Sequence, residues 1–140
     1  MATTAEPTPQ QLPALIHLAA LTHLERQIRA AKTIQDLQFL SVNETRRLIP
    51  YEQAFLLSAS HSANEACRVL NASSVAVVDR DAPMMVWLEQ AVRALFQATN
   101  TKEQPTVIME ELLPESLRSG WREFVKGHVF WCPLQHPDET

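Results

Sequence analysis

Hydrophobic positions along the chain recur at two spacings, and these spacings predict helices alternating with short strands. Apolar residues three and four apart predict helices over residues 14–31, 33–49, 81–97 and 115–125. Apolar runs bounded by turn residues predict strands over residues 51–57, 67–78, 106–109 and 128–134, the second with a bulge near Ser73. This order predicts an α+β fold, with helices packed on an antiparallel sheet.

The stretch from Thr33 to Leu57 sets the boundaries of the second helix and the first strand. Thr33 is a good N-cap residue, and Asp36 stands three residues later, where a capping box places its acidic partner. Pro50 ends the helix because it lacks an amide hydrogen and favours an extended residue before it. A helix laid against a sheet is therefore the first architectural prediction.

The N-terminal part of the chain is expected to be a flexible leader over residues 1–13, followed by a helix that belongs to a single domain of residues 14–140. One apolar stripe of this helix is a candidate dimer interface, made by Leu18, Leu21, Leu24 and Ile28. The same stripe could pack within its own domain, since no sustained heptad repeat marks a coiled coil. Both alternatives stay open.

The amino-acid composition excludes several functional classes. The chain has 140 residues and a formal net charge of −4 without a basic run, which argues against a nucleic-acid partner. Its two glycines cannot build a phosphate-binding loop or a dinucleotide fingerprint, and no GxSxG turn is present. The early apolar run over residues 14–21 is too short to span a bilayer, so no membrane contact by this segment is expected. No catalytic residues and no cofactor are predicted.

Four sets of polar residues have plain structural explanations. Cys67 and Cys132 lie far apart without a CxxC motif, and we interpret them as reduced core residues. His128, Cys132 and His136 recur at four-residue spacing, and a metal could in principle be held by His128 and Cys132 with His61 or Cys67. No paired ligand motif accompanies them, so no metal site is predicted. The run over residues 43–47 is interpreted as a solvated helix face, and Asp79 and Asp81 as turn and cap residues.

Three segments resemble a known family, and they are Asn43–Leu57, Asn71–Pro83 and Gly120–Leu134. They are similar to the cytoplasmic GAF-like region that precedes the membrane segment of some bacterial HlyD-type membrane-fusion proteins, which are efflux adaptors. The resemblance covers Thr33 to Leu134 and rests on packing motifs. It implies a GAF-like sheet, a cytoplasmic location, and a parent protein anchored in the inner membrane.

A full GAF domain has further strands after the position of Pro133 and Leu134 and then a closing helix. The chain is therefore expected to be a truncated GAF fold, either a piece of a longer protein or a short relative that completes its sheet differently. An open sheet edge would then be a second candidate dimer surface.

The resemblance also implies a small-molecule pocket between the sheet and the helices. Its candidate lining is Tyr51, Met84, Trp87 and Trp121. The same side chains could instead fill the core, which is the commoner role of aromatic residues at helical spacing. The leading hypothesis is a non-catalytic sensory or regulatory signalling module that binds a small molecule or a partner. The alternative is a structural dimerisation domain without a ligand.

Overall fold

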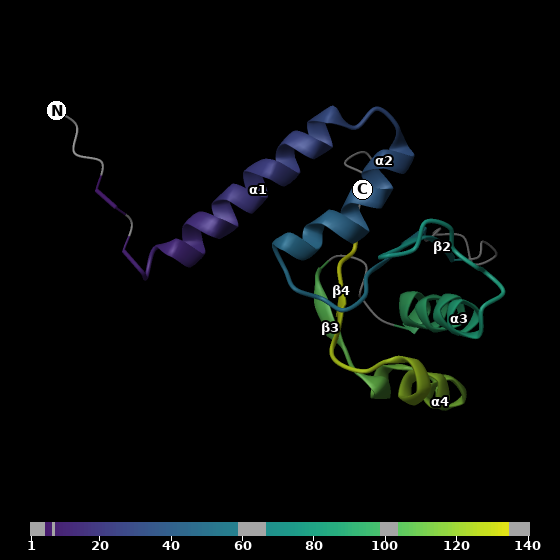
Figure 1. Ribbon diagram of the computed structural model, residues 1–140. Coiled ribbons are helices and arrows are strands. Elements are labelled where there is room, and N and C mark those ends of the chain that lie inside the picture. The colour runs from purple at the N-terminus through teal and green to yellow at the C-terminus, as the bar shows by residue number, and fades with distance from the viewer. Residues whose placement is uncertain (1–4, 7, 59–66, 99–103, 135–140) are drawn as a thin grey trace. The chain divides into compact units, whose positions relative to one another are not determined.

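The computed structural model describes residues 5–6, 8–58, 67–98 and 104–134, and it shows a mixed fold of helices and short strands (Figure 1). The chain forms two compact units. The first unit contains residues 1–56 and 70–78, and the second contains residues 57–69 and 79–140. The α+β class predicted from the sequence is confirmed.

The first unit is built mainly from two helices, α1 (Leu12–Ala30) and α2 (Ile34–Asn43). Pro13 stands in the first turn of α1, where its missing amide hydrogen costs no hydrogen bond. The helix ends because Ala31 is extended, and α2 begins within a few residues. Both helices contact the short 3-10 helix η1 (Glu44–Arg47), which extends α2 toward Pro50.

The predicted capping box at the start of α2 is confirmed. The Thr33 hydroxyl accepts a hydrogen bond from the Asp36 amide at 3.1 Å, and the Asp36 carboxylate accepts one from the Thr33 amide at 3.2 Å. The same carboxylate accepts a second backbone hydrogen bond, from the Lys32 amide at 3.2 Å. The start of α2 is therefore fixed by local chemistry that the sequence displays.

Strands β1 (Phe55–Ser58) and β2 (Arg68–Ala72) pair with each other. The Ser73 amide donates to the Ala54 carbonyl at 2.8 Å, and the buried Ser73 hydroxyl accepts from the Ala54 amide at 2.9 Å. The predicted continuation of the strand over residues 75–78 is wrong. Ser74 has a left-handed backbone, with φ of 64°, and its amide donates to the Asn43 side chain of α2 at 2.8 Å. This hydrogen bond turns the chain away from the paired strands β1 and β2.

The second unit packs α3 (Pro83–Ala98) and α4 (Glu115–Phe124) against each other, as Figure 1 shows. Its sheet consists of β3 (Thr106–Ile108) and β4 (Val129–Trp131), which are antiparallel with Val107 opposite Phe130. The 3-10 helix η2 (Glu110–Leu112) connects β3 to α4. The core of this unit consists of Trp87, Ala91, Leu95, Ile108 and Leu113.

The strands that the structure describes form two separate two-stranded sheets, whereas one sheet was expected. The prediction of a core position is correct for Cys67 and wrong for Cys132, which is exposed. β4 ends at Trp131. Because side chains alternate between the two faces of a strand, Cys132 lies on the same side as Phe130, which is exposed. Burial raises the pKa of the Cys67 thiol, which keeps it protonated at neutral pH.

The capping box leads to a first prediction. Thr33→Ala should destabilise the first unit by about 1 kcal/mol, because the Asp36 amide loses its acceptor. Urea unfolding followed by far-UV circular dichroism measures this loss. Thr22→Ala is the matched control, since Thr22 lies mid-helix in α1 and its hydroxyl only back-bonds to the Leu18 carbonyl. Equal stability of the two variants would contradict the role of the cap.

The same cap should depend on pH. Hydrogen bonds from the Lys32 amide and the Thr33 side chain and amide hold the pKa of Asp36 below its ordinary value of 3.8. A depressed folded-state pKa stabilises the fold at pH above that ordinary value, and the benefit is lost as pH falls through the lower folded pKa. In Asp36→Asn, the free energy of unfolding should no longer show this loss at acidic pH. Urea unfolding at a series of pH values from about 2 to 7 would measure it.

Candidate functional site

The four residues predicted to line a pocket lie in different surroundings. Trp87 on α3 is buried, and Trp121 on α4 is half-buried and packs against the same core cluster. Met84, in the first turn of α3, is half-buried, and its neighbour Met85 is the buried one. Tyr51 belongs to the first unit. The structure therefore brings Trp87 and Trp121 together in one core.

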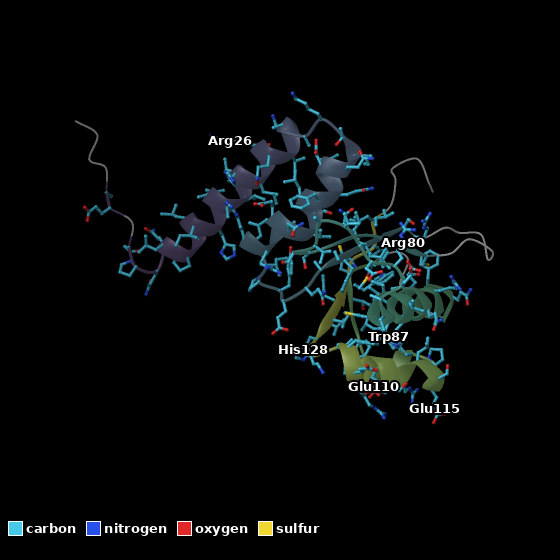
Figure 2. The ribbon with its side chains drawn as sticks, turned by 45° about the vertical axis from the view of Figure 1, so that its right-hand side comes forward. Arg26, Arg80, Trp87, Glu110, Glu115 and His128 are labelled. Atoms are coloured by element: carbon cyan, nitrogen blue, oxygen red, sulfur yellow. The ribbon has the colours of Figure 1, made fainter. Side chains whose placement is uncertain are left out.

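Trp87 makes the central contact of the second unit, and Figure 2 shows it between α3 and α4. Its indole Nε1 donates to the Leu117 carbonyl of α4 at 2.9 Å. A Cβ added to Gly120 would lie 2.1 Å from the indole, so the ring rests directly on the α4 backbone. The Phe124 ring lies 5.7 Å from the indole at a tilt of 44°. Trp87 therefore has a packing role, and its indole N–H is already used in a hydrogen bond within the fold.

The Tyr51 side chain likewise makes its contacts within the first unit. Its hydroxyl donates to the Val42 carbonyl at 2.6 Å and lies 2.9 Å from the Thr45 hydroxyl. The Arg46 guanidinium lies 5.2 Å from the ring centroid and donates to the Glu52 carbonyl at 2.8 Å. This region therefore fastens the end of α2 to the chain that leads into β1. The four-residue pocket stays a prediction from sequence.

Ionisable side chains of the described residues form ion pairs near the surface. The pairs are Arg29–Glu25, Arg47–Glu44 and Arg122–Glu110. Glu89 is partly buried, and its carboxylate accepts a hydrogen bond from the Val69 amide at 3.1 Å. No group of three His, Cys, Asp or Glu residues in the described parts of the chain could hold a metal ion. His61 and His136, which sequence reasoning considered as further ligands, lie outside those parts.

The most unusual surface is on α1. Its first half, residues 12–21, contains no charged side chain, and we call it the apolar half of α1. Five large side chains in it are between 45% and 67% exposed, and these are Leu12, Leu15, Ile16, Leu18 and Leu21. A helix segment that is apolar on all sides is normally covered. In this chain the segment offers a large apolar surface to solvent.

The predicted dimer stripe is corrected at one position. Leu18, Leu21 and Ile28 are exposed, but Leu24 is only 7% exposed and packs in its own unit. Sequence reasoning also missed Leu12, Leu15 and Ile16, because a single stripe at helical spacing was assigned to the helix. The signal that identifies them is the lack of any Asp, Glu, Lys or Arg between Glu6 and Glu25, which leaves the segment without a charged face.

Comparison with known proteins does not assign a family. No protein-family model matches the chain, and no curated protein or solved structure matches it significantly. Among the described residues, no helix is both long enough and apolar enough to cross a membrane.

The contact between Trp87 and α4 leads to a prediction. Gly120→Ala should destabilise the second unit by about 1–3 kcal/mol, because the new methyl group collides with the indole. This loss should exceed the gain of about 1 kcal/mol that alanine has over glycine in a helix. Gly127→Ala is the matched control, since nothing lies within 4 Å of its added Cβ. Urea unfolding followed by tryptophan fluorescence measures both, and equal stability would contradict the proposed packing.

Proposed function

We propose that this chain is a non-catalytic regulatory module that acts through protein–protein contact, with the apolar half of α1 as its contact element. The observation that supports this is the exposure of five large apolar side chains on one uncharged helix segment. The proposal assigns the free energy of covering these side chains to binding, since the contacts within the first unit leave them uncovered.

A protein partner explains this surface better than a lipid bilayer does. Helices that lie in a membrane interface carry lysine or arginine on a polar face, which anionic headgroups attract. The apolar half of α1 has no basic residue, and the nearest cations of the helix are Arg26 and Arg29 near its end. An uncharged apolar surface favours a partner that is itself apolar.

The GAF-like fold is part of the same proposal. The segments around Asn43, Asn71 and Gly120 support a GAF-like module of the kind found in efflux adaptors. The parent protein would then be a bacterial membrane-fusion protein with this module on its cytoplasmic side. A small-molecule sensor is a weaker proposal, because Trp87 and Tyr51 use their polar atoms within the fold.

Substitution of leucines by lysine tests whether the apolar half of α1 is available to bind a partner or is needed for folding. The double variant Leu15→Lys/Leu18→Lys should keep its melting temperature within about 2 °C of the parent, because exposed surface positions tolerate substitution. Leu24→Lys is the matched control on the same helix, and it should lose several kcal/mol because Leu24 is buried. If the double variant unfolded as readily as Leu24→Lys, its leucines would serve the fold and the proposal would be wrong.

Vesicle flotation separates the two kinds of partner. The full chain should stay in solution with both neutral and anionic phospholipid vesicles, because its apolar helix segment lacks basic residues. Binding to either vesicle that disappears in Leu15→Lys/Leu18→Lys would assign the surface to a membrane and overturn a protein contact.

A further inference from the structure

We infer that α1 is a hinged arm of the first unit, which detaches in one piece while α2 keeps its cap and its own contacts. The hinge is the link between Ala31 and Lys32. This inference goes beyond the proposed function, because it concerns how α1 is held and does not depend on what binds its exposed side chains. It rests on the burial of α1, on its hydrogen bonds and on the backbone between the two helices.

The burial of α1 is small for its length. Of its 19 residues only Leu24 is buried, and its neighbours on the same side of the helix, Ala20 and Gln27, are half-buried. By contrast, α3 has 16 residues, and its buried side chains are Met85, Trp87, Ala91, Val92 and Leu95. Because burial of apolar surface is the main free energy that holds a helix in place, the first unit holds α1 weakly.

One hydrogen bond joins α1 to the described chain beyond the hinge. The Nε2 atom of His17 lies 3.0 Å from the Leu48 carbonyl, which follows η1. The side-chain hydrogen bonds of Thr22 and Arg29 reach residues of α1 itself. Since His17 is exposed, water replaces its contact with Leu48 at a modest cost in free energy.

α2 is fastened independently of α1. The Asn43 side chain at its end accepts a hydrogen bond from the Ser74 amide at 2.8 Å, and the Val42 carbonyl accepts one from the Tyr51 hydroxyl at 2.6 Å. These bonds connect α2 to the segments before β1 and after β2. The end of α2 therefore stays in place when α1 leaves.

The backbone between the helices divides at a single link. The Ala31 amide donates back into α1, to the Gln27 carbonyl at 3.0 Å and the Ile28 carbonyl at 3.2 Å. The Lys32 amide donates forward, to the Asp36 carboxylate in the cap of α2 at 3.2 Å. Rotation about the ψ angle of Ala31 and the φ angle of Lys32 therefore moves α1 without breaking either set of bonds.

Detachment changes the surface that α1 offers. In the attached state Leu24 is only 7% exposed. In the detached state Leu24 and Ala20 join the side chains that are already exposed. A partner that binds this side of α1 selects the detached state, and its apparent affinity falls with the population of that state. The hinge thus regulates how much apolar surface α1 presents.

Native-state hydrogen exchange of the full chain, followed residue by residue by NMR, tests the hinge. A single helix of 19 residues is only marginally stable in water, so its amides exchange once it detaches. The Leu24 amide should be protected at least about tenfold less than the Val42 amide of α2, and its exchange should depend less on urea than global unfolding does. Equal protection of the two amides would show that further contacts hold α1 and would overturn the inference.

Two matched substitutions separate release of α1 from general destabilisation. Leu24→Ala should lower the protection of α1 by roughly tenfold or more, because it truncates the buried side chain of that helix, and it should leave α2 within about twofold of the parent. Val42→Ala, at the buried position of α2, should lower the protection of α2. If Leu24→Ala lowered the protection of both helices equally, they would open together and the hinge would be wrong.

Discussion

The contact between the Trp87 indole and the backbone of α4 is the constraint on which the second unit depends. A tryptophan can lie against a helix backbone only where the facing residue has no side chain, and Gly120 provides that position. The hydrogen bond to the Leu117 carbonyl then satisfies the indole N–H, which would be costly to bury alone. One glycine and one tryptophan thus fix the spacing between α3 and α4.

This contact also bears on function. A ligand pocket needs space and a few unpaired polar groups that converge on it. The Trp87 ring is covered by α4 and its nitrogen is engaged, and the Tyr51 hydroxyl is engaged by the end of α2. Trp87 and Tyr51 therefore serve mainly to hold helices in place. Five large apolar side chains in the first half of α1 remain exposed, and the proposed function rests on them.

Local chemistry made much of the fold predictable from sequence. The start of α2 follows from Thr33 and Asp36, because capping side chains act within a few residues. The strand expected over residues 75–78 failed for the opposite reason. Ser74 is held in a left-handed turn by Asn43, which lies 31 residues earlier, and no local pattern displays that bond.

The candidate contact surface shows a similar limit. Helical spacing predicted an apolar stripe on α1, but it could not decide which apolar side faces the chain's own unit. Burial of Leu24 and the bonds of His17 decide that question, and they leave Leu15 and Leu18 outside. Tertiary contacts were needed because a segment with large apolar residues on several sides has no unique stripe.

The small size of the apolar half of α1 is itself informative. A larger uncharged surface would make the single chain prone to aggregation, whereas a smaller one would not hold a partner. The uncharged segment of α1 spans residues 12–21, and the charges of the helix follow from Glu25 on. Under the proposed function, a contact of this size would form and dissociate as the concentration of the partner changes.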